Sequence, residues 1–474
     1  MCGVFGFCNN CNNNGRQGVV RELMIGGSDV AHRGEQGWGV ATSYDNKIFC
    51  HRREGRFGEG ITERKAEELV RKMPGNLGLA HALYSTVGRS GHRKQPKNIQ
   101  PYVADFHGRQ FALSYNGNVY DLSGLREVVR ARGWKFKSSV SDTEVIVALI
   151  STSEKTDFLA ALQEVLPLLK GAFSLVLLYD GKIFGARDRF GIRPLCIGSG
   201  EDYSILSSES CAFYSIGAKL VREARPGEIV VIGEKGIERC INWAENPCSR
   251  FCIFEFVYFA RPDSVLSGGM SAWHYRTEAG KILARESPVE ADIVISSPSG
   301  GDIYTEAYTY ELNALSHELD AQFVTGLFKT RFIVRTFLTP RGTDRKKLQR
   351  RKLHPFEEVL RGKRVCIVED SIVRNNVCPE IVTMCFEAGA REVHVRVGSS
   401  PVVSPCYYGI DMATKGELAA TNLSIEQIRE QTTANSLAYL SLDGMVRATG
   451  LPKENLCLAC FNGDYPVPPP TEVC

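Results

Sequence analysis

Cys2 is the residue of this chain whose position has the clearest chemical meaning. It follows Met1 directly, so removal of Met1 would leave one residue that carries both a thiol and a free α-amino group. An amine with a pKa near ~8 can accept the thiol proton, which places a nucleophile and its base on the same residue. The alternative is a small hydrophobic cysteine near the start of a strand, the commoner role of this residue type. Position alone leaves both interpretations open.

A pair of adjacent carboxylates is the second feature with a chemical use. Glu369 and Asp370 follow the apolar run Val365–Val368, which has the composition of a buried strand. Two carboxylates at a strand end can accept hydrogen bonds from sugar hydroxyls or bind a divalent cation. Without further support, a solvated acidic pair that caps a helix is the favoured interpretation.

Cysteines are the third feature. The chain has 16 of them at irregular spacing, which favours reduced thiols, metal ligation or catalysis over a disulfide framework. Cys457 and Cys460 form the clearest pair with metal-ligand spacing, and Cys8 and Cys11 form a rival pair. Four thiolates would suit structural zinc and an iron–sulfur cluster equally well.

The elements of the first half, residues 2–245, are mostly short and β-like. The runs 111–115, 172–179 and 228–232 are predicted strands, and 62–72 and 142–149 are predicted helices. Asp142 fits the N-cap of the second helix. This pattern predicts a layered α+β structure with much antiparallel sheet.

The pattern changes after about residue 285. Strands are predicted at 291–296, 363–370 and 392–397, with a helix over 377–387 that Gly389 would end. Strand, loop, helix and strand in this order indicate a parallel sheet, whose ligands lie beyond the carboxyl ends of its strands. The proline-rich run 465–470 cannot continue a regular element and is expected to be extended or disordered.

Length and composition limit the class of protein. A chain of 474 residues is too long for one hydrophobic core, so we expect at least two domains. The net charge of +3 gives little indication of nucleic-acid or membrane binding. No apolar run approaches the roughly 20 residues that cross a bilayer, and no charged and then apolar leader opens the chain. We therefore expect a cytoplasmic protein with small-molecule partners, no nucleic acid and no membrane.

Six motifs stand beside Cys2 in the first half. They are His32–Gly34, His81–Gly88, Tyr115–Asn118, Ser141–Glu144, Gly171–Ser174 and Arg187–Pro194. In this order they resemble an N-terminal-nucleophile glutamine amidotransferase domain. The resemblance implies that Cys2 attacks the glutamine carboxamide and that Asn116 and Gly117 form the oxyanion hole. It further implies that Asp142 and Thr86 bind glutamine and that Arg33 supports the site.

Three later motifs extend this resemblance to the end of the chain. Cys252–Ser264, Glu369–Arg374 and Ala459–Pro466 are similar to those of the glutamine phosphoribosylpyrophosphate (PRPP) amidotransferase family. The resemblance implies a glutaminase domain over 2–245, a phosphoribosyltransferase-type α/β domain over 246–450 and a C-terminal segment over 451–474. It implies transfer of glutamine-derived ammonia to C1 of PRPP, giving 5-phosphoribosylamine in the first step of de novo purine synthesis, by a homotetramer.

The family resemblance also assigns the second site. Glu369 and Asp370 would bind the ribose and Mg²⁺, and the loop after them would hold the 5′-phosphate at a helix N-terminus. The basic run Pro340–Pro355 would close over PRPP; a solvated surface loop or a weak nucleic-acid patch is its alternative. The implied PRPP-binding residues are Lys329, Arg331, Lys352, Glu369, Asp370, Ser371 and Arg374.

The cysteines acquire a specific expectation from the same resemblance. Cys252, Cys406, Cys457 and Cys460 fall at the ligand positions of the iron–sulfur branch of the family. The implied cofactor is a [4Fe-4S] cluster, with zinc or free thiols as the alternatives.

Both implied sites depart from the family pattern. Leu83 stands where the family usually has an arginine that grips the glutamine α-carboxylate. Asn375, Asn376 and Val377 replace a Gly-Thr-Thr run, and Ser299 removes a carboxylate. The alternative functions are therefore an impaired or regulatory paralogue and an ammonia-dependent variant. A further alternative takes Ser299–Asp302 as a pyrophosphatase-type ATP loop.

Overall fold

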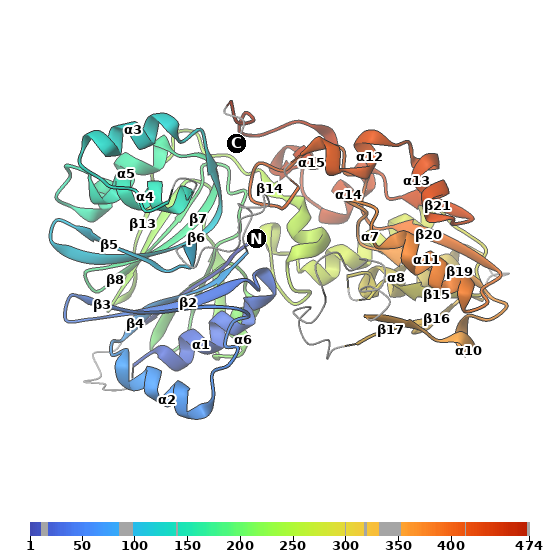
Figure 1. Ribbon diagram of the computed structural model, residues 1–474, viewed down its shortest axis with the longest axis horizontal. Coiled ribbons are helices and arrows are strands. Elements are labelled where there is room, and N and C mark those ends of the chain that lie inside the picture. The colour runs from blue at the N-terminus through green and yellow to red at the C-terminus, as the bar shows by residue number, and fades with distance from the viewer. Residues whose placement is uncertain are drawn as a thin grey trace.

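The structure is a computed structural model that describes residues 1–10, 18–84, 98–138, 141–298, 300–316, 320–330, 352–412 and 414–471. Two halves lie side by side, and the N-terminus lies between them (Figure 1). The first half contains two antiparallel sheets, and the second contains a parallel sheet.

One sheet of the first half has seven strands in the order β11-β9-β10-β1-β4-β2-β3. They are β1 (Gly3–Asn9), β2 (Gly37–Tyr44), β3 (Lys47–Glu54), β4 (Leu77–Leu83), β9 (Cys196–Ser199), β10 (Tyr203–Ser207) and β11 (Lys219–Glu223). The other sheet has six strands in the order β13-β12-β8-β7-β6-β5. They are β5 (Tyr102–Phe106), β6 (Arg109–Tyr120), β7 (Lys170–Tyr179), β8 (Lys182–Arg187), β12 (Glu228–Gly233) and β13 (Gly236–Asn242).

Helices cover the outer faces of both sheets. On the seven-stranded sheet these are α1 (Val20–Asp29), α2 (Glu63–Lys72) and α6 (Cys211–Tyr214), and on the six-stranded sheet α3 (Ser123–Ala131), α4 (Asp142–Ser151) and α5 (Phe158–Val165). A separate apolar cluster, with Val4, Leu79 and Val176 among its members, fills the space between the sheets. Alternation along each strand therefore supplies two buried faces, one for each layer.

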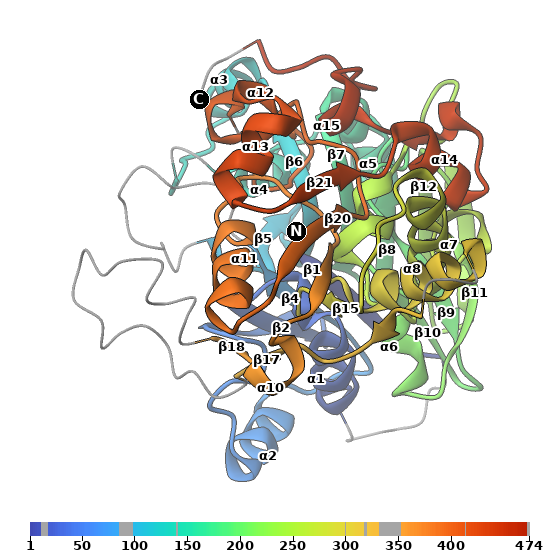
Figure 2. The same ribbon diagram turned by 90° about the vertical axis from the view of Figure 1, so that its right-hand side faces the viewer.

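The second half is built around five parallel strands in the order β16-β15-β19-β20-β21. They are β15 (Ile293–Ser296), β16 (Gln322–Phe323), β19 (Arg364–Glu369), β20 (Glu392–Val397) and β21 (Ser436–Tyr439). Helices α7 (Ala272–Glu286) and α8 (Asp302–Leu315) lie on one side of this sheet, and α11 (Cys378–Glu387) and α13 (Ile425–Thr432) lie on the other (Figure 2).

Shorter elements complete the second half. They are β14 (Phe251–Cys252), β17 (Leu327–Lys329), β18 (Leu353–Pro355), β22 (Leu456–Cys457), α10 (Glu357–Leu360), α12 (Ala419–Asn422), α14 (Leu442–Thr449), α15 (Ala459–Asn462) and a π-helix at Glu255–Phe259. Single 3₁₀ turns occur at Ala31–Arg33, Leu166–Leu168, Ser267–Gly269, Lys415–Glu417 and Lys453–Asn455. Within the described residues, no helix combines the length and the apolar character needed to cross a membrane.

The predicted fold class is confirmed, with local corrections. Every predicted strand is present, and β20 has the predicted bounds. The N-cap of α4 is Ser141, not Asp142, because the Ser141 hydroxyl accepts the Glu144 N–H at 3.2 Å and Asp142 is the first helical residue. Among the helices of eight residues or more, α1, α3, α5, α7, α8, α13 and α14 were not predicted. The proline-rich run is extended: the Tyr408 hydroxyl donates to the Val467 carbonyl at 2.6 Å, and the Tyr120 hydroxyl donates to that of Pro468 at 2.8 Å.

Candidate functional site

Cys2 lies directly before β1, the strand that pairs with both β10 and β4 at the centre of the seven-stranded sheet. Its Sγ accepts a hydrogen bond from the Tyr84 backbone N–H at 3.4 Å, at the end of β4. Burial raises the pKa of the Cys2 thiol, and the neighbouring α-amino group opposes this rise. The α-amino group, here on Met1, is itself buried, and burial lowers its pKa to about 4. This pKa belongs to the amine of Met1; removal of Met1 would place the α-amino group on Cys2 itself, beside the thiol.

Arg33 lies behind the nucleophile. Its side chain is fully buried, and its Nε donates to the Cys2 carbonyl at 3.0 Å. The rest of the guanidinium bonds both Glu209 and Glu255; its Nη2 donates to Glu255 Oε1 at 2.8 Å. The predicted supporting residue therefore contacts the backbone of the nucleophile and is held from the other side by two carboxylates.

Asn116 and Gly117 lie in β6, on the sheet that faces Cys2. Ala112 of the same strand packs between the sheets, so alternation turns Asn116 toward the strands that carry Cys2 and Tyr84. The Asn116 side chain is fully buried, and neither its Nδ2 nor its Oδ1 has a hydrogen-bond partner among the described residues. Gly117 has φ +153°, and a Cβ there would lie 2.0 Å from the Ala172 carbonyl oxygen. A buried amide without a partner costs stability, so its presence indicates a ligand-binding role.

Asp142 begins α4 and faces the same region. Its Oδ1 accepts the Thr143 N–H at 2.7 Å, and its Oδ2 accepts the Val119 N–H at 3.4 Å. Burial raises the pKa of the Asp142 carboxyl, and the Asp142 charge contributes to the raised pKa of the Cys2 thiol. A ligand ammonium group would reverse the burial effect, because it would favour the ionised carboxylate.

Two further positions belong to the predicted glutamine site: Thr86, an expected binding residue, and Leu83, the departure from the family pattern. Thr86 lies outside the described residues. Leu83, the last residue of β4, is half-buried beside Tyr84, and its backbone is pressed against Gly34, where a Cβ would lie 2.4 Å from the Leu83 carbonyl carbon. The apolar side chain thus lies one residue from the backbone amide that bonds the nucleophile.

The carboxylate pair lies at the carboxyl end of β19, the central strand of the parallel sheet. Burial and the neighbouring Asp370 raise the pKa of Glu369, and burial raises the pKa of Asp370. Asp370 Oδ1 accepts a hydrogen bond from the Ser371 hydroxyl at 2.7 Å. Gly300, on the loop after β15, approaches so closely that a Cβ there would lie 1.7 Å from Asp370 Oδ2. The pair thus holds protons more tightly than solvated carboxyls do and faces a second loop.

The loop after this pair leads to the N-terminus of α11. Arg374 is engaged within the protein, since its Nε donates to Glu417 Oε2 at 2.7 Å and its Nη2 donates to the Asp411 carbonyl at 2.6 Å. Asn375 has φ +51°, a left-handed conformation that asparagine adopts more readily than most residues. Val377 is the N-cap of α11 and supplies no side-chain cap. The N–H groups of the first turn are not capped by that side chain.

The remaining predicted PRPP-binding residues lie at the base of the basic run. Lys329 ends β17, and its Nζ donates to the Pro298 carbonyl at 3.3 Å, which links it to the loop after β15. Lys352 is exposed, and its carbonyl accepts the Thr330 N–H at 2.8 Å. Arg331, Ser299 and residues 340–351 lie outside the described residues, as does Cys11 of the rival cysteine pair.

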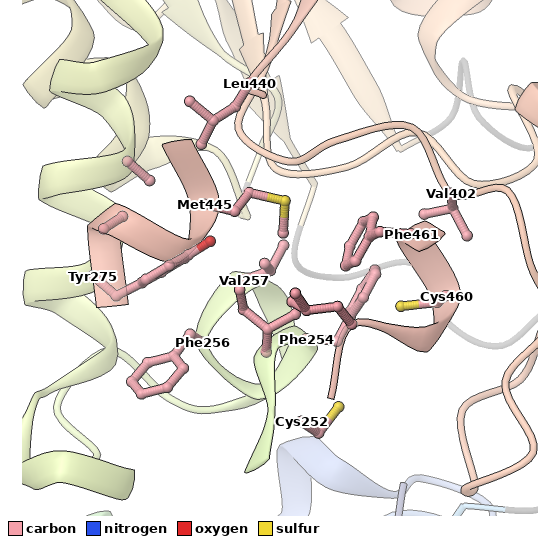
Figure 3. Packing of buried hydrophobic residues seen from close by; sticks show 14 of the residues in the cluster. Cys252, Phe254, Phe256, Val257, Tyr275, Val402, Leu440, Met445, Cys460 and Phe461 are labelled. Atoms are coloured by element: carbon pink, nitrogen blue, oxygen red, sulfur yellow. The ribbon is translucent and has the colours of Figure 1, made fainter. Parts of the chain in front are cut away.

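The four predicted cluster ligands lie on neighbouring segments of the chain. Cys252 in β14 is paired in register with Cys457 in β22, and the Cys460 carbonyl accepts the Val403 N–H at 2.9 Å, three residues before Cys406. Figure 3 shows the sulfur atom of Cys460 beside the stacked rings of Phe254 and Phe461, with Cys252 below them. Burial raises the pKa of Cys252 to about 11, and burial also raises the pKa values of Cys457 and Cys460. In the described ranges, no three His, Cys, Asp or Glu side chains are grouped tightly enough to hold a single metal ion.

Glu209, Glu255 and Arg193 are buried near Arg33, and none of them was assigned a role from the sequence. Glu209 accepts hydrogen bonds from Arg33 and from the Ser264 hydroxyl, the latter at 2.6 Å. Glu255 and Arg193 pair at 3.3 Å, and neither side chain is exposed. Arg193 and Glu255 lie inside motifs that carried the resemblance, so their presence was visible, but their contacts join residues 62 and more positions apart.

Comparisons with known proteins agree with this geometry. Residues 89–215 match the family model described as a glutamine amidotransferase domain. The chain is 37% identical to the amidophosphoribosyltransferase of Methanocaldococcus jannaschii, over 98% of each chain. It is 39% identical to that of Archaeoglobus fulgidus over 94% of each chain, and 39% identical to that of a Synechocystis strain over 100% of this chain and 92% of the relative.

Solved structures show the same similarity in three dimensions. The glutamine PRPP amidotransferase of B. subtilis, complexed with ADP and GMP, superposes with a TM-score of 0.87 at 33% identity and 98% coverage of both chains. A structure titled as the allosteric regulatory enzyme of purine biosynthesis gives 0.88 at 34% identity, over 98% of this chain and 96% of the other.

The fold and the matches define a class of enzyme in which an N-terminal-nucleophile glutaminase precedes a phosphoribosyltransferase-type domain. Within that class, the chain belongs to the amidophosphoribosyltransferase family. The full-length similarity supports a glutamine-dependent transferase over an impaired or regulatory paralogue and over an ammonia-dependent variant. The second half shares its fold with PRPP amidotransferases, which argues against an ATP loop at Ser299–Asp302.

Proposed function

We propose that this protein transfers glutamine-derived ammonia to C1 of PRPP and forms 5-phosphoribosylamine, glutamate and pyrophosphate, the first step of de novo purine synthesis. The observation that carries the glutaminase half is the buried Asn116 amide, which has no partner among the described residues and faces the strands beside Cys2. The carboxylate pair at the end of β19 carries the transferase half.

The first half-reaction begins once Met1 is removed. The α-amino group of Cys2 takes the thiol proton, and Sγ attacks the carboxamide carbon of glutamine. The developing oxyanion is stabilised by the Asn116 amide and the Gly117 backbone, which are already in place. Asp142 binds the α-amino group of glutamine. Ammonia leaves with the returned proton, and water then hydrolyses the thioester to give glutamate and free Cys2.

The second half-reaction uses the end of the parallel sheet. Glu369 and Asp370 accept hydrogen bonds from the ribose hydroxyls, and the loop from Ser371 to the start of α11 binds the 5′-phosphate through backbone N–H groups. Mg²⁺ bound with PRPP would neutralise charge on the pyrophosphate leaving group. Ammonia attacks C1 as the C1–O bond to pyrophosphate breaks, and the surplus proton passes to solvent. Lys329, Arg331 and Lys352 lie at or beside the basic run and supply positive charge to the phosphates.

We infer that Cys252, Cys406, Cys457 and Cys460 hold a [4Fe-4S] cluster. Two observations support this inference. The charges of the other three cysteines all contribute to the raised pKa of Cys460. The four thiols nevertheless do not form the tight group that a single metal ion requires, as far as the described residues show. In a cluster each thiolate binds a different iron, so the sulfur atoms stand farther apart than around a single zinc ion. The buried Arg193 guanidinium also has a donor without a partner in the described structure, which suits a negatively charged sulfur site. Such a cluster would stabilise this region.

The metal proposal has a direct test. Protein purified without oxygen should be brown, absorb near 400 nm and contain iron and sulfide. Stoichiometric zinc without iron would contradict it. A cytoplasmic location and a homotetramer are further proposals from the family resemblance; sedimentation equilibrium of the purified protein tests the second.

Pyrophosphate release tests the proposed function. The protein is mixed with PRPP, Mg²⁺ and either glutamine or ammonia, beside a Cys2→Ser control. We expect release with both nitrogen donors in the wild type and only with ammonia in the control. Absence of release with both donors would contradict the proposal.

A further inference from the structure

Three fully buried charged side chains form a continuous chain between the nucleophile and the four-cysteine site. Arg193 Nη1 donates to Glu255 Oε1 at 3.3 Å, and Arg33 Nη2 donates to the same oxygen at 2.8 Å. None of the three side chains is exposed to solvent.

Both ends of this chain are anchored on backbone carbonyls. Arg33 Nε donates to the Cys2 carbonyl at 3.0 Å, and Arg193 Nε donates to the Tyr408 carbonyl at 2.7 Å. The intermediate hydrogen bonds leave Glu255 no freedom to turn without breaking a contact to one of the two arginines. The position of the nucleophile is therefore tied to a backbone segment of the other half.

The same short segments carry the predicted cluster ligands. Glu255 lies three residues after Cys252, and Tyr408 lies two residues after Cys406, whose Sγ accepts the Tyr408 N–H at 3.4 Å. A shift of either cysteine would move a residue that Arg193 holds.

One donor of Arg193 is not used by these contacts. Its Nη2 is buried and has no hydrogen-bond partner among the described residues. After burial, the charges of Cys252 and Cys406 act on Arg193 more strongly than that of Glu255 does. A thiolate sulfur is a hydrogen-bond acceptor that would satisfy this donor when the cysteines are ionised.

The buried charges around this chain of contacts balance one another. Arg33 and Arg193 are balanced by Glu209 and Glu255, so the buried set is neutral as a whole. Removal of one member would leave an uncompensated charge in the protein interior, which costs more than the pair itself contributes.

We propose that Arg193 is a positioning residue that couples the four-cysteine site to the nucleophile, through Glu255 and Arg33. The proposal rests on the proposed function in that Cys2 is the glutaminase nucleophile. The arginine touches neither substrate nor the reacting atoms, and its effect is to hold the Cys2 carbonyl, and with it the thiol, in the attacking position.

The test is a double-mutant cycle on the full-length holoprotein. The variants are Arg193→Met, Glu255→Gln and the double variant, in which the buried set is again neutral. Arg396→Met is the matched control, because Arg396 is also buried and its hydrogen bonds to Ser287, Pro288, Val395 and Ser436 all lie within the second half of the molecule. The readouts are kcat and KM for glutamine hydrolysis, ammonia-dependent pyrophosphate release and the rate of Cys2 alkylation by iodoacetamide.

Arg193→Met should lower kcat for glutamine hydrolysis by about 10- to 100-fold, since displacement of a catalytic group by about 1 Å has this effect. KM for glutamine should change little, because Asp142 and Asn116 are untouched, and ammonia-dependent release should stay close to the control. The effects of the two substitutions should be less than additive, because both break the same connection. Where Arg193→Met does not fold, Arg193→Lys serves in its place; one ammonium cannot hold both Glu255 and the Tyr408 carbonyl, so kcat should again fall.

Three outcomes would overturn the proposal: a kcat equal to that of Arg396→Met, fully additive effects, or an equal loss of ammonia-dependent release. Failure of the proposed function is a separate result, in which the wild type itself releases neither glutamate nor pyrophosphate. The alkylation rate of Cys2 still reports the coupling in that case: it should differ between wild type and Arg193→Met, and an unchanged rate would overturn the proposal. In the loaded protein, Arg193→Lys should also shift the reduction midpoint of the cluster, while Arg396→Met should not.

Discussion

The two halves of the molecule build their sites in different ways. The proposed glutaminase site is built around the sheets: Asn116 and Gly117 lie within β6, Cys2 lies directly before β1, and Arg33 is held by two buried carboxylates. The transferase site is formed at strand ends, and only Glu369 comes from the sheet itself. Side chains fixed by sheet packing are preorganised before the ligand arrives, whereas a loop-built site acquires its geometry with the ligand.

The sequence departures follow the same division. Leu83 is a single departure from the family pattern at the proposed glutamine site, while the proposed transferase site differs at Ser299 and at three successive positions, 375–377. Asn375 shows how a loop change can be accommodated: it takes a left-handed backbone, which asparagine tolerates better than most residues. The comparison predicts that single changes in the glutaminase site have local effects, and that the transferase site depends chiefly on its carboxylates.

Loss of the nucleophile should give the largest effect. Cys2→Ser should lower glutamine-dependent pyrophosphate release by at least about 1,000-fold, since removal of a catalytic nucleophile commonly costs more than this. Ammonia-dependent release should remain, because the transferase half is unchanged. Parallel assays with the two donors measure both effects, and a loss of the ammonia-dependent reaction would show that the sites are not separable.

Neutralising one carboxylate of the acidic pair should impair the transferase half and leave the glutaminase half active. Asp370→Asn should weaken PRPP binding by about 10- to 100-fold, because a charge-assisted hydrogen bond contributes about 1.5–3 kcal/mol. Glutamine hydrolysis without PRPP should be unaffected. Calorimetry with Mg²⁺ and PRPP measures the first effect, and unchanged affinity would remove Asp370 from the proposed site.

An arginine at position 83, where the family usually has one, should strengthen glutamine binding. Leu83→Arg should lower KM for glutamine by about 10-fold or more, since the new cation can bond the α-carboxylate. The matched variant Leu83→Met adds length without charge and should leave KM near the wild-type value. A wild type that already binds glutamine tightly, together with no gain in Leu83→Arg, would show that another cation serves this function.

The acidic pair also predicts a pH dependence, the smallest of these effects. Because burial raises both pKa values, Glu369 and Asp370 of the free protein hold protons at pH values where solvated carboxyls are ionised. Mg²⁺ and ribose hydroxyls bind the ionised form, so affinity for Mg–PRPP should rise with pH above the ordinary carboxyl range, by up to about tenfold per unit for each proton released. Calorimetry in buffers of different ionisation enthalpy should detect this proton release. Proton uptake on binding would contradict the assignment.

Local patterns predicted the fold class and several of its elements. Strands β15 and β19 contain continuous apolar runs, and Gly389 ends α11 as expected, with φ +87°. Helix α1 was missed because Gly26 and Gly27 argue against a helix. In the structure these glycines admit the rings of Phe5 and Phe57, and a Cβ at either position would lie within 2.4 Å of a ring atom. The contact that stabilises α1 is therefore tertiary.

The site was predicted where motifs carry it and missed where long-range contacts do. Cys2, Asn116, Asp142 and the acidic pair could be named from sequence order. The Arg193–Glu255–Arg33 chain could not, because buried ion pairs between residues 62 and 222 positions apart leave no local pattern. Arg374 shows the opposite case. The family motif assigns it to PRPP binding, whereas its guanidinium donates to Glu417 and to the Asp411 carbonyl in the structure.

The stoichiometry of the two products tests the central claim most directly. Glutamate and pyrophosphate are measured together in one reaction that contains the mature wild-type protein, glutamine, PRPP and Mg²⁺. If glutaminase and transferase act as one enzyme, both products should form at equal rates, and omission of glutamine should stop pyrophosphate release in the absence of ammonia. Glutamate formation without any pyrophosphate, or pyrophosphate release that requires added ammonia, would contradict it.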